Sequence, residues 1–288
     1  MNVVIHNVKS NPGDSAFLIV SENAAVLCDT GFAFTGEAVA ENIKKCLGDK
    51  PLDLILLTHS HYDHALGAPY IKKHYPDCKV VAGEYAAKIF AKPTARAVMR
   101  DLDSKFAKTC GVCDYEDLID ELEADITVND GDKIECKDMT FKVISLPGHT
   151  KCSVAYYLEE EKLLLSTETI GVYDGENTVV PSYLVGYEMT LESIEKAKAL
   201  DIEKMLVPHM GVIDRARAQY YLSEAKRSAE NTYNEIKELL QSGKSHDDAV
   251  EYFKNKFYHG RIVEAYPIDA MMLNTNIMVS LIEKSLLS

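Results

Sequence analysis

The sequence predicts an α/β fold, a four-layer αββα sandwich with an all-helical C-terminal extension. Two stretches of short apolar runs, each completed by helical patterns, indicate two β-then-α halves with their helices facing outward. After Gly211 only helical patterns follow, which indicates an appended subdomain. We therefore divide the chain into residues 1–212, with a helical insertion at about 84–123, and residues 213–288.

The first half begins with a meander of strands around the turn at residues 11–14 and continues as strand and helix in alternation. Strands are expected at residues 3–8, 16–21, 24–29, 52–57 and 79–82, and helices at 36–47 and 65–74. The insertion carries Lys88, Lys92, Arg96 and Arg100 at every fourth position, across a kink expected at Pro93. These cations form either a stripe that holds an anionic substrate or a solvated helix face.

The second half returns to strands from residue 126, with a tight turn at 129–132. Further strands are expected at 139–146, 153–158, 162–167 and 204–207, with a helix at 189–200. In the extension, Asp214 is expected to cap a long helix that ends at residue 242. Ser245 and Asp248 are expected to cap the second helix, and Pro267 to begin a third helix that is rich in methionine. The methionine-rich face packs on the first domain, covers the site as a lid, or forms a dimer contact.

Composition narrows the class of protein. The chain has 288 residues, 47% of them hydrophobic, and a formal net charge of −14. That charge argues against a nucleic-acid partner, because phosphate binding needs a basic face. The sequence predicts no export signal and no apolar run that could span a bilayer, so we expect a cytoplasmic protein with no membrane partner. The seven cysteines are expected to be reduced thiols.

A cluster of ligand-type side chains directly follows the apolar strand at 52–57. His59, His61, Asp63 and His64 lie within six residues, in a strand-to-helix loop. Alternation along the strand end puts His59 and His61 on one side, where they can share a metal, while Asp63 and His64 lie past the turn and can reach a second. Imidazole and carboxylate suit zinc, iron or manganese, so the cluster predicts a binuclear metal site.

With this cluster the sequence resembles the metallo-β-lactamase superfamily, and the resemblance covers most of residues 1–212. Four further segments match the family's motifs in order and with suitable gaps: Leu27-Cys-Asp29-Thr-Gly, Pro147-Gly-His149-Thr, Ser166-Thr-Glu168-Thr and Pro208-His209-Met-Gly. One motif departs from the family, whose bridging acid is normally aspartate. Glu168 either bridges, binds one metal only, or intrudes on the open coordination position, and Asp174 is a weaker substitute.

The resemblance implies two divalent metal ions, zinc first, with iron or manganese as the other choices. The implied ligands are His59, His61 and His149 for the first metal, Asp63, His64 and His209 for the second, and Glu168 between them. Asp29 is expected to hold a histidine ring or the loop in place. A hydroxide bridging the metals is the expected nucleophile, with Asp63 orienting it and moving its proton.

We therefore expect a hydrolase of small ester-like substrates, with thioester, lactone and phosphodiester linkages in that order. Tyr183 and Tyr187 are expected to line the pocket of this small-molecule substrate, and a homodimer through residues 213–288 is the expected assembly. A di-iron oxidoreductase of the flavodiiron type is one alternative, although that class usually has glutamate where His61 stands. A regulatory or ligand-sensing protein that keeps the metals without turnover is the other.

Overall fold

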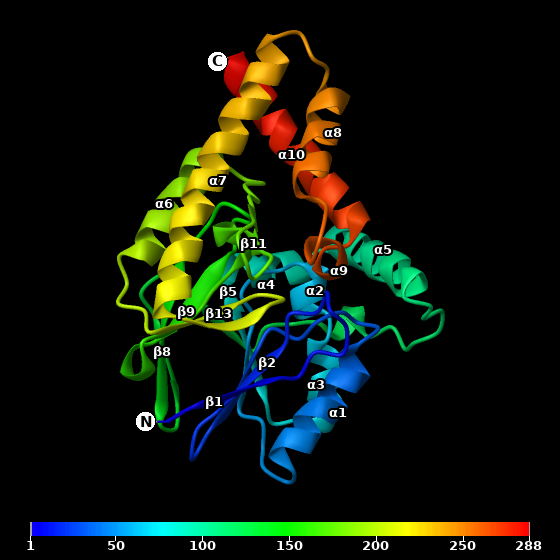
Figure 1. Cartoon of the computed structure of the whole chain (residues 1–288). Helices are drawn as coiled ribbons and strands as arrows, with labels where there is room; N and C mark the ends of the chain where they lie inside the picture. Colours follow the sequence, from blue (N-terminus) through cyan, green and yellow to red (C-terminus); the bar gives the residue numbers. More distant parts are fainter. Residues whose placement is uncertain (1, 288) are drawn as a thin grey trace.

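The computed structural model describes residues 2–287, and its core is two six-stranded sheets packed face to face (Figure 1). The first sheet has the order β1-β2-β3-β4-β5-β6, and the second has the order β14-β13-β10-β9-β8-β7. Strands β3 to β6 run parallel, as do β10 and β13, while the other pairs are antiparallel.

The strands are short. The first sheet contains β1 (Val4–Asn7), β2 (Phe17–Val20), β3 (Ala25–Cys28), β4 (Leu54–Leu56), β5 (Lys79–Gly83) and β6 (Ile126–Val128). The second contains β7 (Lys133–Cys136), β8 (Met139–Ser145), β9 (Val154–Leu158), β10 (Leu163–Leu165), β13 (Lys204–Val207) and β14 (Gly211–Asp214). A separate two-stranded ribbon pairs β11 (Val172–Tyr173) with β12 (Val179–Val180).

The helices lie outside the sheets. Those of the first half are α1 (Gly36–Leu47), α2 (Tyr62–Ala65), α3 (Ala68–His74), α4 (Glu84–Phe90) and α5 (Pro93–Thr109). Those of the second half and the extension are α6 (Tyr187–Lys198), α7 (Arg215–Gln241), α8 (His246–Phe257), α9 (Ile262–Ala265) and α10 (Ile268–Leu286). No helix among residues 2–287 combines the length and the apolar character needed to cross a bilayer.

Alternation along the strands produces the four layers. In β4, Leu54 and Leu56 face the second sheet, whereas Ile55 packs with Val39 of α1 on the opposite face. In β10, Leu164 packs toward α6 and α7 while its neighbours point between the sheets. Strands buried on both faces need apolar residues at every position, which is what these runs supply. The predicted αββα sandwich is confirmed.

The predicted helix at 65–74 is instead two helices, α2 and α3, separated at Gly67. A Cβ at Gly67 would lie 2.1 Å from the backbone oxygen of Thr30, so the chain here packs backbone against backbone. At Pro93 the expected kink is a break between α4 and α5, with proline in the first turn of α5. The turn at 129–132 carries the chain from one sheet to the other.

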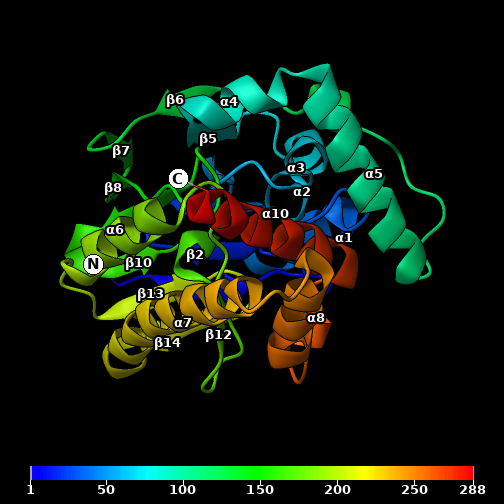
Figure 2. The ribbon, with the colours of Figure 1, turned by 90° about the horizontal axis from the view of Figure 1, so that it is seen from above.

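The C-terminal extension is continuous with the second half of the sandwich. The first half of α7 packs on the second sheet through Ala218, Tyr221 and Leu222, and its second half packs with α8 and α10. Figures 1 and 2 show α7, α8 and α10 rising together from the sandwich, with the first turns of α10 directed toward α5. The extension therefore reaches the insertion of the first half.

Candidate metal centre

The candidate ligands all follow strand ends at one edge of the two sheets. Asp29 comes directly after β3, and the 59–64 cluster follows β4 in the neighbouring parallel position. In the second sheet His149, Glu168 and His209 follow β8, β10 and β13, which run in the same direction. Because strands that run the same way end at one edge, segments far apart in sequence meet there.

The first group of side chains consists of His59, His61, His149 and Glu168, whose candidate ligand atoms lie within 4.8 Å of one another. Glu168 Oε2 is 2.9 Å from His149 Nε2 and 3.7 Å from His59 Nε2. His149 Nε2 is also 2.9 Å from His61 Nδ1. The structure thus brings together the three histidines that the sequence assigned to the first metal.

The second group consists of Asp63, His64, Glu168 and His209, again within 4.8 Å. His209 Nε2 lies 2.9 Å from Glu168 Oε1 and 3.7 Å from Asp63 Oδ2. His64 Nε2 lies 3.6 Å from Asp63 Oδ2 and 3.9 Å from Glu168 Oε2. These are the residues that the sequence assigned to the second metal.

Glu168 belongs to both groups. It begins a single 3₁₀ turn, Glu168–Ile170, after β10, and its two carboxylate oxygens face different histidine sets. The extra methylene of glutamate therefore places the carboxylate between the two groups. This is the position that a bridging acid needs.

Two unpaired nitrogen atoms point to metal binding. His59 Nε2 and His64 Nε2 are buried and have no hydrogen-bond partner among the described residues. Leaving a buried polar atom unpaired costs about 1–3 kcal/mol, which a metal–nitrogen bond would offset. The two groups, with imidazole and carboxylate donors, fit two divalent cations of the zinc, iron or manganese type.

The outer nitrogens of these rings are held by their neighbours. His64 Nδ1 is 2.7 Å from Asp29 Oδ2, and His149 Nδ1 is 2.7 Å from Ser182 Oγ. His209 Nδ1 lies 2.9 Å from the backbone oxygen of Gly13 and donates a hydrogen bond to it. Fixing Nδ1 turns Nε2 inward, so these contacts orient the ligands. The sequence predicted this for Asp29 but not for Ser182 or Gly13, which no motif marks.

Electrostatics favour neutral His59 and His61 rings beside an ionised glutamate, whereas the carboxylates of Asp29 and Asp63 raise the pKa of His64 against the effect of its burial. Burial lowers the pKa of both His59 and His61 well below its ordinary value, and neighbouring imidazoles lower it further. Burial alone would raise the pKa of Glu168, but the histidines around it, His149 above all, hold it well below its usual range. Metal ligation requires these protonation states.

Two ligand-loop residues have strained backbones. Asp29 and His209 have φ values of 56° and 62°, in the left-handed region that non-glycine residues seldom adopt. Gly148, next to His149, has φ 145°, and a Cβ there would lie 2.2 Å from Thr190 Oγ1. Such strain is common at functional sites, where the surrounding structure holds it in place.

A cavity of about 180 Å³ opens on the two groups. Its floor includes His61, Asp63 and Glu168, and its walls come from Tyr62, α5, Leu184, Tyr266 and α10. The extension therefore covers the site, as expected for a lid. The expectation for Tyr183 and Tyr187 is wrong: neither lines this cavity, and they pack with each other and with Tyr233 beside α7.

The basic stripe of the insertion is bound to neighbouring groups. Arg100 pairs with Asp117 and Asp120, and Arg96 Nε donates to the backbone oxygen of Phe90 at 2.6 Å. Lys88 pairs with Glu84 at 2.6 Å on an exposed face. None of these cations lines the cavity over the metal groups. Of the two alternatives for this stripe, the clamp for an anionic substrate is therefore not formed, and the arginines anchor the acidic segment after α5.

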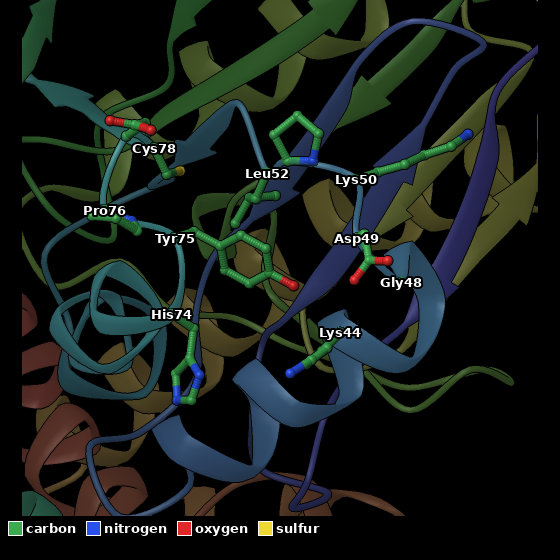
Figure 3. A pocket seen from close by; sticks show the side chains of 11 residues that line it. Lys44, Gly48, Asp49, Lys50, Leu52, His74, Tyr75, Pro76 and Cys78 are labelled. Carbon is green, nitrogen blue, oxygen red and sulfur yellow. The ribbon is translucent and has the colours of Figure 1, made fainter.

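A second pocket lies at the opposite edge of the first sheet. Figure 3 shows Tyr75 with Lys44 and His74 around it. Leu52 and Cys78, which also line this pocket, precede β4 and β5, whereas the metal groups follow the ends of these strands. Ligands of open α/β sheets bind beyond the carboxyl ends of the strands, so this pocket does not belong to the metal site.

Comparison with known families agrees with this geometry. The model of the metallo-beta-lactamase superfamily matches residues 13–209, which is more than half of the chain and contains every candidate ligand. The chain belongs to the metallo-beta-lactamase superfamily. The matched segment ends at His209, so the helices after β14 lie outside it.

Individual members of this superfamily match only part of the chain. A hydroxyacylglutathione hydrolase from Ectopseudomonas mendocina is 31% identical over 123 residues, 43% of this chain and 35% of that protein. An acyl-coenzyme A thioesterase, MBLAC2, from Gallus gallus is 26% identical over 190 residues, 62% of this chain and 65% of that protein. The chain thus spans about a third of the first relative's length and somewhat under two thirds of the second's.

The fold is shared over almost the whole chain with a solved structure. A metallo-beta-lactamase family protein from Thermus thermophilus has a TM-score of 0.65 at 19% identity, with 94% of this chain and 88% of that chain covered. This coverage extends beyond the matched family segment into the helical extension, so a superfamily sandwich that carries such an extension has a structural precedent.

Proposed function

We propose that this protein is a binuclear metal-dependent hydrolase of small ester-like substrates, with thioesters and lactones ahead of phosphodiesters. The observation that supports it most is the position of Glu168. Its carboxylate lies between two histidine groups, at the floor of a cavity that admits a small molecule. The likeness to a hydroxyacylglutathione hydrolase and to an acyl-coenzyme A thioesterase favours thioesters.

The metal ions and the protein residues have separate tasks in this proposal. When bound, two divalent ions lower the pKa of water and polarise a substrate carbonyl. The neutral rings of His59 and His61 are ready to bind a cation without losing a proton. Asp63 lies at the cavity floor, where its carboxylate can orient a water molecule and accept its proton.

The Asp63 side chain is accessible from the cavity, which the role of a general base requires. Its side chain is 13% exposed and lines the cavity, whereas the side chains of His59 and His64 are 0% exposed. Burial raises the pKa of Asp63, with the Glu168 carboxylate adding to the rise against the opposing effect of His64. A carboxylate that accepts protons more readily than an ordinary aspartate suits a general base.

The test is to count zinc, iron and manganese in the purified chain, and then to assay hydrolysis of thioesters, lactones and phosphodiesters after loading each metal. We expect two metals per chain and thioester turnover, with fewer metals and little turnover in Glu168→Ala. Glu192→Ala, an exposed glutamate on α6, is the matched control and should keep both.

Other results would favour other functions. Full metal loading without hydrolysis of any thioester, lactone or phosphodiester tested would overturn the hydrolase proposal. Reduction of oxygen or nitric oxide by the iron-loaded protein would then support a di-iron oxidoreductase. Tight binding of a small molecule without turnover would support a sensing role.

A further inference from the structure

The cavity over the metal groups continues outward between α5 and α10. Val98 and Leu102 of α5 and Leu273 of α10 line both this inner cavity and an outer groove on the surface. These three side chains therefore form a shared wall that connects the metal groups to solvent. The view from above shows α10 crossing the molecule with its first turns directed toward α5 (Figure 2).

The inner cavity is too small to enclose a drug-sized ligand. Its volume is about 180 Å³, below the roughly 300–1,000 Å³ typical of pockets that enclose such a ligand. A substrate of that size whose reacting bond reaches Glu168 would extend into the outer groove.

The lining of the inner cavity is apolar and carries no positive charge. Aside from the metal groups, its wall contains mostly aliphatic side chains, including Met99 and Ile277. The polar exceptions are Tyr62, Tyr266 and Asn274, and Asn274 Nδ2 donates to the Tyr266 hydroxyl at 2.5 Å. No lysine or arginine of residues 2–287 lines it. An anionic group would find no countercharge there apart from the metals.

The outer groove combines an apolar strip with three charged side chains. Its apolar members are Ala97, Val98, Leu102 and Leu273, and Val98 and Leu273 are 56% and 45% exposed. Its one cation, Lys105, is 2.7 Å from Asp101, and Asp269 adds a second carboxylate. An exposed apolar strip that continues into a reactive site fits an uncharged aliphatic chain.

We infer that the substrate is an acyl thioester or ester whose uncharged aliphatic chain lies along the wall formed by Val98, Leu102 and Leu273. This inference rests on the proposed hydrolase function and specifies its substrate. In the reaction, water adds its oxygen to the acyl carbon, and the bond from that carbon to sulfur or oxygen breaks. The carboxylic acid and the thiol or alcohol leave, with one proton from water ending on the leaving group.

The first experiment measures binding without turnover. Metal-loaded protein is titrated by calorimetry with 2-alkanones from 2-butanone to 2-decanone, which are uncharged and cannot be hydrolysed. An alkyl chain that enters an apolar passage increases the affinity of its ligand by about threefold to fourfold per methylene. We expect this gain in affinity in the wild type and in Val263→Trp. In Val98→Trp the new side chain fills the groove, so we expect a gain below about twofold per methylene.

The two valine variants are matched. Val98 and Val263 are both exposed aliphatic residues on helices, 56% and 47% exposed, but Val263 lines neither the inner cavity nor the groove. Both proteins are checked for two bound metals and for an unchanged thermal midpoint. An affinity that does not depend on chain length in the wild type, or an equal loss in both variants, would overturn the inference.

The second experiment compares turnover of octanoyl and acetyl thioesters. We expect kcat/KM to favour octanoyl by at least about tenfold in the wild type, since several methylenes are removed from water, and Val98→Trp to remove most of that preference. Equal turnover of both substrates would refute the aliphatic chain while leaving the hydrolase proposal intact. No turnover of either, with chain-dependent binding preserved, would refute the hydrolase and retain the apolar passage.

Discussion

Asp29 holds the second ligand group in place through several contacts. Its carboxylate accepts hydrogen bonds from the backbone nitrogen of Thr58 at 2.8 Å and from Ser15 Oγ at 3.0 Å. The same carboxylate lies 2.7 Å from His64 Nδ1. It thereby joins the loop after β3 to the loop after β4 and sets the direction of the His64 ring.

Replacing Asp29 with asparagine should weaken one metal more than the other. The amide cannot accept all of these hydrogen bonds, so the His64 ring loses its fixed orientation. We expect the affinity of the metal in the second group to fall by about 10–100-fold, with the first group less affected. Competition against a fluorescent chelator measures both affinities. Asp201→Asn, an exposed aspartate paired with Lys162, is the control, and an unchanged Asp29→Asn protein would contradict the role assigned to Asp29.

Asp103 on α5 should make the stability of the fold depend on pH in a way that does not involve the metals. Burial raises the pKa of Asp103 from 3.8 to about 6, although Tyr115 and the Ala33 backbone donate hydrogen bonds to it. Between these two values the folded protein binds more protons than the unfolded chain. The contribution of Asp103 to stability therefore falls as pH rises through this window.

Asp103→Asn should remove this dependence. Relative to the wild type, the variant should become more stable by at most about 3 kcal/mol as pH rises from about 4 to 7. Urea unfolding at several pH values measures the difference. A constant difference across that range would show that Asp103 keeps an ordinary pKa.

At the scale of elements, the cap of α8 gives a local test of the extension. Ser245 Oγ accepts from the Asp248 backbone nitrogen at 3.1 Å, and Asp248 Oδ2 accepts from the Ser245 backbone nitrogen at 2.9 Å. Ser245→Ala should cost about 1 kcal/mol and lower Tm by roughly 2–4 °C. Turnover should not change, because α8 does not line the cavity. Calorimetry checks the midpoint against Ser10→Ala, an exposed serine before β2.

The elements that the sequence predicted well are those whose signals are local. The strand β13 and the helix α1 have the predicted bounds, and Asp214 and Ser245 cap the helices they were expected to cap. Each depends on periodicity or on a capping residue within a few positions. The ligand cluster at 59–64 was equally clear, since its members follow one apolar strand.

The predictions that failed depend on long-range contacts. The break at Gly67 arises from the backbone of Thr30. The sequence left two alternatives open for the basic stripe, and carboxylates at residues 117 and 120 decide between them. Tyr183 follows Glu168 closely in sequence, but its ring packs against Tyr187 and Tyr233 instead of the cavity. Two tyrosines do line the cavity. Tyr62 lies inside the ligand cluster, whereas Tyr266 comes from a connection before α10 that carries no motif.

At the scale of the whole molecule, the metal groups join the two halves of the sandwich. The loop after β4 supplies one part of the candidate ligands, and the loops after β8, β10 and β13 supply the rest. Each group of four combines side chains from both sheets. Metal binding should therefore stabilise the contact between the sheets. Loss of the metals should lower the free energy of unfolding of the entire chain.

Removal of metal should lower the thermal stability of the folded protein. With free metal at about 100 times its dissociation constant, one site adds about 2.7 kcal/mol, which raises Tm by roughly 5–10 °C in a chain of this size. Scanning calorimetry of the chelated and reloaded protein measures the shift. His209→Ala should lose much of it, whereas His259→Ala, exposed after α8, should keep it. An equal shift in both variants would mean that His209 takes no part in metal binding and that the stabilising ion sits elsewhere.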